Sequence, residues 1–96
     1  MKDKDTIPIE TFCAHYKVPV TFIHSLQKYE LLEIIRENNV EYIQITQLQR
    51  VEKMIRLHYE LNINMEGLDV VNNLLGQLME LQEENRILRD RLKLFE

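Results

Sequence analysis

The stretch "IETFCAHYKVPVTFIHSLQKYELL", residues 9 to 32, has the pattern of two short helices separated by a sharp break. Pro19 lies at the break, where it lacks an amide proton and restricts the backbone of Val18, so the first helix ends before it. Leu31 and Leu32 are expected to close the pair against the core. The other apolar residues at helical spacing are expected to point inward: Ile9, Phe12, Cys13, Phe22, Ile23 and Leu26. The pattern therefore predicts a compact helix-turn-helix.

The middle of the chain, "EIIRENNVEYIQI" at residues 33 to 45, changes from helical to β character. β-branched residues and a tyrosine flank the turn signal "ENN", which predicts a small hairpin or wing. A third helix is expected from about Thr46, a good N-cap residue, to about Leu61. Its buried stripe is predicted at four positions: Leu48, Val51, Ile55 and Tyr59.

A single long helix is predicted for the last part of the chain. Asn64 is a good N-cap residue after the corner "NIN", and the helix is expected over residues 65 to 94, a length of roughly 45 Å. Gly76 is its one weak interior point. Residues 1 to 6 are charged and are expected to be frayed. The predicted fold class is therefore mainly α, with a winged head at residues 1–63 and a long dimerisation helix at residues 64–96.

Along this helix, apolar residues follow the alternating three-and-four spacing of a coiled-coil seam, with one polar residue among them. The seam positions are Val71, Leu74, Leu78, Leu81, Asn85, Leu88, Leu92 and Phe95. The alternative is an amphipathic helix packed on its own domain, but so small a domain cannot cover this length. We therefore expect the seam to pair two copies into a homodimer. Asn85 weakens the packing, yet paired polar groups satisfy each other only in one register and oligomer state.

The charges beside the seam leave the direction of the pairing open. In a parallel dimer Glu84 would face the partner subunit's Arg89, and in an antiparallel dimer it would face the partner subunit's Arg91. Both arrangements are attractive. The sequence therefore supports dimerisation more firmly than it supports either direction.

The composition bounds the kind of partner. The net charge is −4 and both halves of the chain are slightly acidic, whereas domains that bind a DNA duplex usually carry a basic face. This balance fits a basic protein partner better than nucleic acid. One cysteine, and the lack of an apolar run long enough to span a membrane, predict a cytoplasmic protein.

No pattern of residues predicts catalysis, a metal or a cofactor. Cys13 and His15 are two residues apart and point to different sides of a helix, so they cannot chelate a metal together. His24 and His58 are isolated, and Cys13 occupies a small core position. No glycine-rich phosphate loop or nucleophile motif is present. The sequence therefore favours a binding protein over an enzyme.

The helix-turn-helix, the piece "EYIQI" and the later "INMEGL" resemble the winged helix of MerR-type regulators. The apolar core positions agree with that family. Four DNA-contacting positions do not: His24 stands in place of the recognition-helix arginine, Ser25 and Leu26 in place of tyrosines, and Ile43 in place of the wing arginine. The resemblance implies a MerR-like winged helix-turn-helix, while the lost contacts oppose DNA binding.

Three pieces are more specific: "FCAH", "RLHYELNINMEGL" at residues 56 to 68, and "LQEENRILRDRLKLF" at residues 81 to 95. They resemble the chaperone-modulator family typified by CbpM, and the resemblance covers nearly the whole chain except the hairpin. It implies that the protein binds the J domain of a DnaJ-like co-chaperone of the CbpA type and inhibits its stimulation of DnaK. The alternatives are a MerR-type DNA-binding transcriptional regulator and a dimeric adaptor with another partner.

The resemblance also implies a binding surface, because J domains of this class carry a basic second helix that an acidic protein could occupy. We predict this surface on the third helix and on the corner after it. Its charge partners are Glu52, Glu60, Glu66 and Asp69, with Arg56, Leu57 and His58 as neighbours. The alternative for each of these charges is that it only solvates the outer face of a helix.

Overall fold

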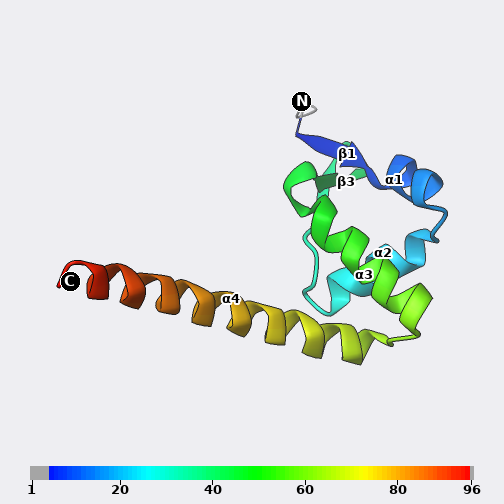
Figure 1. Cartoon of the computed structure of the whole chain (residues 1–96). Helices are drawn as coiled ribbons and strands as arrows, with labels where there is room; N and C mark the ends of the chain where they lie inside the picture. The colour runs from blue at the N-terminus through cyan, green and yellow to red at the C-terminus, as the bar shows by residue number, and fades with distance from the viewer. Residues whose placement is uncertain (1–4, 96) are drawn as a thin grey trace.

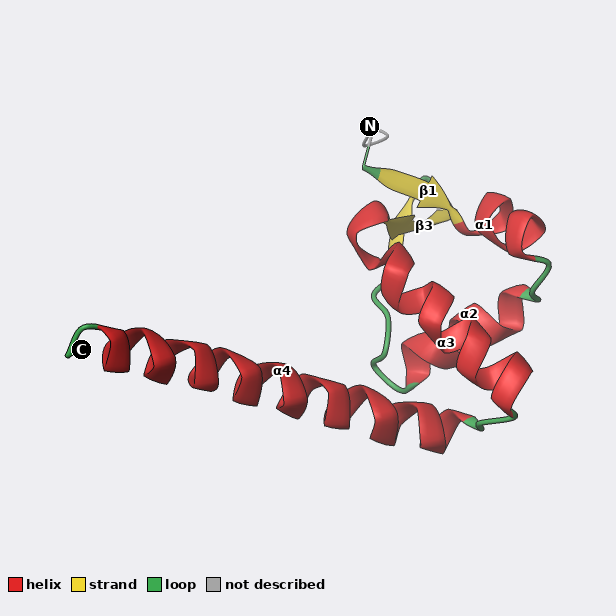
Figure 2. Cartoon of the chain, viewed as in Figure 1, coloured by secondary structure: helices red, strands yellow, loops and turns green. Residues whose placement is uncertain are grey.

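A computed structural model describes residues 5–95 of the chain as a helical head and one long helix that leaves it (Figure 1). A small sheet lies at one end of the head, and α4 passes the opposite end before it continues alone to the C-terminus (Figure 2). The elements in chain order are β1 (Thr6–Pro8), α1 (Ile9–Tyr16), α2 (Val20–Lys28), β2 (Ile35–Glu37), β3 (Val40–Gln44), the 3-10 turn η1 (Ile45–Gln47), α3 (Leu48–Leu61) and α4 (Met65–Lys93). The predicted fold class, mainly helical and MerR-like with a long last helix, is confirmed.

The helix-turn-helix forms where the sequence predicts it. Lys17 takes a left-handed conformation (φ 58°) at the end of α1, and its amide donates a hydrogen bond to the Cys13 carbonyl. Pro19 has an extended backbone and directly precedes α2, where its carbonyl accepts from the Phe22 amide at 3.1 Å. The missing amide proton of proline is harmless at this position, because the first amides of a helix have no intrahelical acceptor.

The predicted wing is a hairpin of β2 and β3. Asn38 and Asn39 both have positive φ (52° and 64°), the conformation of a two-residue type I′ turn that asparagine tolerates well. The sheet also contains β1, so that its order is β1-β3-β2 with both pairings antiparallel. The expectation of a frayed start is wrong for Thr6, which pairs with Gln44. Residues 1 to 4 of that expectation lie outside the described residues.

The start and the buried stripe of α3 differ from the prediction. Thr46 lies in the 3-10 turn η1, and the helix begins two residues later at Leu48. The reason is Gln47, whose side-chain amide exchanges two hydrogen bonds (3.1 and 3.2 Å) with the backbone of Glu33 and holds the turn against the preceding loop. Tyr59 is 48% exposed rather than part of the core, and Met54 is buried instead.

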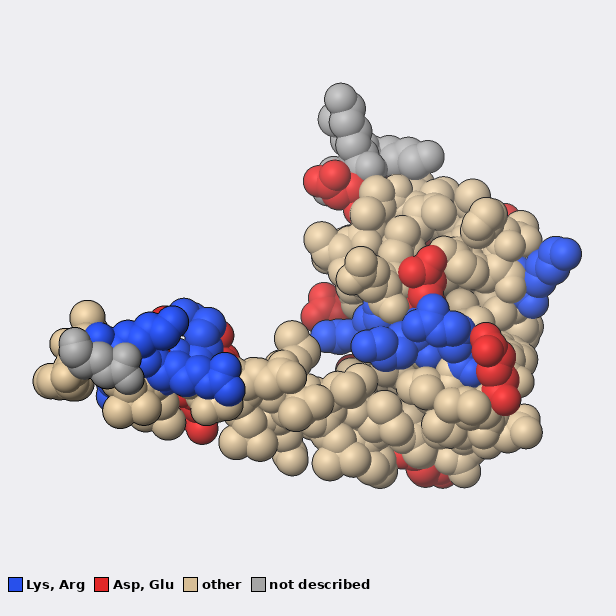
Figure 3. All heavy atoms as spheres, in the orientation of Figure 1, with Lys and Arg blue, Asp and Glu red and all other residues tan. Residues whose placement is uncertain are grey.

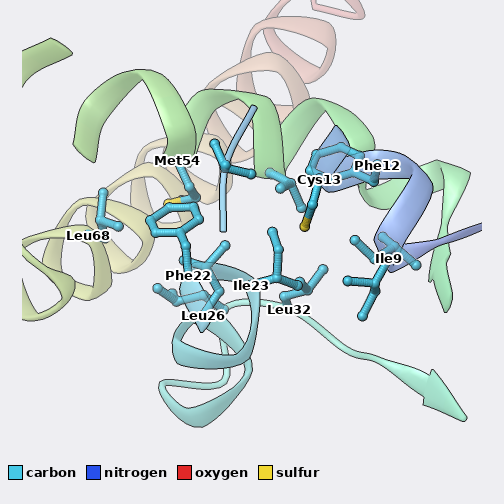
Figure 4. Close-up of a cluster of buried hydrophobic side chains, with 13 residues drawn as sticks. Ile9, Phe12, Cys13, Phe22, Ile23, Leu26, Leu32, Met54 and Leu68 are labelled. Atoms are coloured by element: carbon cyan, nitrogen blue, oxygen red, sulfur yellow. The ribbon is translucent and has the colours of Figure 1, made fainter. Parts of the chain in front are cut away.

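The hydrophobic core joins α1, α2, β3, α3 and the start of α4 (Figure 4). Phe12 and Cys13 of α1 and Ile43 of β3 meet the apolar faces of α2 and α3. Leu68, from the first turn of α4, is fully buried with them at 0% exposure. The core therefore extends into the long helix. The predicted domain boundary between residues 63 and 64 falls at this corner and stays a prediction.

A tightly built corner connects α3 to α4. Asn62 ends α3 in a left-handed conformation (φ 56°), and the side chain of Asn64 accepts the Gly67 amide at 2.8 Å, which confirms the predicted N-cap. At Gly67 a Cβ atom would lie only 2.6 Å from the side chain of Ile63, so this turn needs glycine. Helix α4 then runs unbroken for 29 residues, through Gly76.

Candidate protein-interaction surfaces

A carboxylate connects α2 to the wing. Glu41 of β3 lies 2.8 Å from His24 Nε2 on α2 and accepts a hydrogen bond of 2.7 Å from Arg36 on β2. The hydrogen bond from Arg36 is the main cause that lowers the pKa of the Glu41 carboxyl below its ordinary value. The hydrogen bond from His24 is the second cause. A negative charge therefore lies between the helix and the wing, where a DNA-binding protein would need positive ones.

Two of the four positions that depart from the MerR pattern are core positions. Ile43 and Leu26 are both fully buried, so neither side chain can reach a ligand at the surface. Ser25 and His24 are half-buried, and the imidazole of His24 is hydrogen-bonded to Glu41. The head thus keeps the winged-helix scaffold without a cationic side chain at any of these four positions.

An acidic cluster forms where α2 meets the start of α4. Tyr29, at the C-terminal end of α2, has its pKa raised, first by the negative charge of Glu66 and then by burial, hydrogen bonding to Glu66 and the charge of Asp69. Glu66 is exposed and Asp69 is half-buried. We name these three residues, Tyr29, Glu66 and Asp69, the acidic corner.

The sequence predicted two of the three residues of the acidic corner. Glu66 and Asp69 are close in sequence and belong to the predicted J-domain surface. Tyr29 was missed, because it comes from another helix and only the fold brings it there. An acidic pair one turn apart at the start of the last helix was the available signal.

The other predicted partner residues lie in different surroundings. Glu52 faces α1, where it accepts a hydrogen bond from the Tyr16 hydroxyl and thereby raises the pKa of that tyrosine. His58 supports the corner after α3, with Nδ1 2.8 Å from the Ile63 carbonyl oxygen and its ring against Phe22. Leu57 is half-buried against the core, while Glu60 and Arg56 are exposed. Their contact with a partner stays a prediction.

The predicted seam lies along the free part of α4. Leu78, Leu81, Asn85 and Leu88 line one shallow surface together. Val71 at the head end of the seam is half-buried, whereas Phe95, just beyond the end of α4, is 88% exposed. Leu74 and Leu92 are also exposed. Beside them, Arg86 pairs with Glu83 (2.6 Å) and Asp90 (3.0 Å).

Residues 5–95 contain no helix that is long and apolar enough to cross a membrane. In the same range, no three His, Cys, Asp or Glu side chains gather into a group that could hold a metal ion. Cys13 is buried, and this burial raises the pKa of its thiol. A thiol of this kind is protonated and packs as a small apolar group.

Comparison with known proteins agrees with this description of the head. Residues 7–90 match the family model described as MerR HTH family regulatory protein. No curated protein and no solved structure matches the chain. The matched family consists of regulatory proteins rather than a class of enzymes, and CbpM is one of its members. The chain belongs to the MerR helix-turn-helix family of regulatory proteins.

Proposed function

We propose that this protein binds the J domain of a DnaJ-like co-chaperone of the CbpA type and inhibits its stimulation of DnaK. The observation that carries the proposal is the acidic corner. Its Glu66 lies within the motif "INMEGL", which also carries part of the resemblance to the chaperone modulators, and Asp69 follows that motif directly. A carboxylate pair on a fixed scaffold suits a basic helix, with charge complementarity acting mainly on the association rate and on specificity.

The acidic corner is held in place by backbone structure. The Asn64 cap fixes the first turn of α4, His58 holds the carbonyl of Ile63, and Leu68 anchors the same turn in the core. Glu66 and Asp69 therefore project from a turn that is ordered before any partner arrives. An interface arranged in advance loses less conformational entropy on binding.

The alternative function is DNA binding as a transcriptional regulator, which the family as a whole allows. It would use α2 and the wing, where Glu41 engages both His24 and Arg36. A duplex would bring phosphates towards this carboxylate and would have to break its ion pair with Arg36 and its hydrogen bond with His24. The charge of this surface favours a protein partner over DNA.

We further propose that the protein acts as a homodimer through the seam of α4. The exposed leucines of the seam form a long apolar stripe that a single chain leaves in water, and its register is that of a coiled coil. In a dimer of this kind, each copy would keep its own acidic corner.

Calorimetric titration of the protein with the J domain of the host's CbpA-type co-chaperone, at two salt concentrations, tests the proposal. The variant Glu66→Lys/Asp69→Lys is expected to weaken binding at least about tenfold and to reduce its salt dependence. The control Glu10→Lys/Glu33→Lys makes the same change in net charge on the head, and Glu10 also lies in the first turn of a helix. Absence of binding by the native protein, or equal weakening by both variants, would contradict the proposal.

A further inference from the structure

A groove of about 860 Å³ lies between α3 and α4, and none of its lining residues belongs to the acidic corner. One wall is formed by α3 and is mostly cationic, with Arg50, Lys53 and Arg56; its one carboxylate, Glu52, accepts a hydrogen bond from Tyr16 of α1. The other wall is formed by α4 and is mostly apolar, with Leu75, Leu78 and Met79. Figure 3 shows Lys and Arg side chains gathered on the side of the head that faces α4. We name this feature the α3–α4 groove.

The three cations of the α3–α4 groove have no acidic partner. Within residues 5–95, none of them forms an ion pair with a carboxylate, whereas Arg36 and Arg86 each do. They recur every third residue, so they rise about 9 Å along one side of the helix. A row of this length matches acidic residues spaced three or four apart on a second helix.

Gly76 leaves open space in the α4 wall of this groove. It lines the groove in the middle of α4, where glycine is unfavourable for a helix. A Cβ atom at this position would meet nothing within 4 Å, so the packing of this chain does not require glycine. The missing side chain leaves room for a second backbone to lie close to α4.

The α3–α4 groove is largely distinct from the dimer seam. Its α4 wall uses Leu75, Gly76 and Met79, which are not seam positions, and the two surfaces share Leu78. The groove also differs from the acidic corner in the sign of its charge. A basic J-domain helix would be repelled by the cationic wall, so the groove requires a second kind of partner.

We propose that the α3–α4 groove binds an amphipathic helix with an acidic face, supplied by another protein. The apolar side of that helix packs on Leu75, Leu78 and Met79 and passes close to Gly76. Its carboxylates lie against Arg50, Lys53 and Arg56. The apolar contacts then supply most of the binding energy, while the cations set the orientation and reject basic helices.

Fluorescence anisotropy with a labelled synthetic helix tests this proposal on the full chain. The probe is a peptide of about 18 residues, with leucines along one face, glutamates beside them and alanines elsewhere. A matched peptide carries lysine at every glutamate position. The acidic peptide is expected to bind, and the lysine peptide is not.

Three variants locate the site of binding. Arg50→Glu/Lys53→Glu is expected to weaken the acidic peptide about tenfold or more, because two attractions become repulsions. Lys17→Glu/Lys28→Glu makes the same charge change on the exposed surface of the head and should weaken it less than about twofold. Gly76→Leu should also weaken binding, although it favours the helix. Arg56 stays native, because it is also a predicted J-domain neighbour.

Several results would overturn the proposal. Equal weakening by the two double variants would show attraction to net charge alone. If the chain bound a single-stranded oligonucleotide as tightly as the acidic peptide, the groove would be a site for polyanions in general. A change in the solution mass of the chain on Arg50→Glu/Lys53→Glu would show that a second copy fills the groove. The J-domain titration changes Glu66 and Asp69, which do not line the groove, so either proposal can fail without the other.

Discussion

The head and the free part of α4 are stabilised in opposite ways. The head encloses its own apolar residues, and α4 contributes Leu68 to that core with 0% exposure. Further along the same helix, Leu88 is 56% exposed and is not part of the buried core. Both residues belong to one uninterrupted helix, so helical structure by itself does not say what stabilises a residue. The first turn of α4 is stabilised by the core of the head, whereas the leucines of the free part remain exposed in the single chain.

The largest expected effect comes from truncating these two leucines. Leu68→Ala leaves a cavity in the core and should lower the free energy of unfolding by about 3 kcal/mol. Leu88→Ala removes the same atoms from an exposed position and should leave that free energy unchanged in dilute, monomeric protein. Its effect should appear instead as weaker self-association. Urea unfolding followed by circular dichroism, with sedimentation for the association, measures both. If both variants lost a comparable amount of stability in dilute solution, the proposed difference between the head and the free part of α4 would be contradicted.

Asn85 tests whether the free part of α4 is specified by a partner copy. Asn85→Leu removes a polar group from the seam and should stabilise the associated form by about 2 kcal/mol, while permitting other oligomer states. The head should be unaffected. Light scattering of the variant across a range of concentrations gives its mass. A uniquely dimeric mass, equal to that of the native protein, would count against a specificity role for Asn85.

The two glycines of α4 lie in opposite surroundings within a single helix. Gly67 is packed against Ile63, and Gly76 lies in open space. Gly67→Ala forces a methyl group against Ile63 and should destabilise the protein by about 1.5 kcal/mol. Gly76→Ala places the same group in open space and should stabilise the helix by up to about 1 kcal/mol. Thermal unfolding of both variants at one concentration checks the opposite signs. Two changes of the same sign would mean that the corner or the helix is packed differently.

The sequence predicted those parts of the fold that short-range chemistry specifies. Pro19 marks the break between α1 and α2, Asn38 and Asn39 mark the hairpin turn, and Asn64 marks the start of α4. Each acts through its own backbone or its nearest neighbours. The elements that were missed depend on distant partners. Strand β1 exists because it pairs with β3, and Gln47 shifts the start of α3 because it binds the backbone of Glu33.

The candidate surfaces follow the same rule. Glu66 and Asp69 were predicted as charge partners at the corner after the third helix, whereas Tyr29 reaches them only through the fold, from the end of α2. The cationic row of α3 has a regular three-residue spacing and was present in the sequence. Glu52 and Glu60 alternate with these cations along the same helix, so the sequence alone does not show that the cations share a face. The position of the row opposite α4 follows only from the angle between the two helices.

The smallest expected effect is the contribution of single ion pairs to the free energy of unfolding. One pair of the head and one pair of the free helix can be compared at two pH values. Glu41 has a lowered pKa in the folded protein because of Arg36 and His24, so its stabilisation is present above its ordinary pKa of 4.5 and is lost as the pH falls through the lower folded value. Because Arg36 is largely exposed, solvent screening limits this contribution to about 0.5 kcal/mol.

Glu41→Gln should therefore lower the free energy of unfolding at pH 7 and make little difference at a pH below the folded pKa of Glu41. Glu83 provides the matched case, since Arg86 lowers its pKa in the same direction. That pair, however, is exposed on a single helix and links no other element. Glu83→Gln should have no measurable effect at either pH. Urea titrations of both variants at the two pH values decide the comparison, and an equal pH dependence would show that Glu41 does not join α2 to the wing in solution.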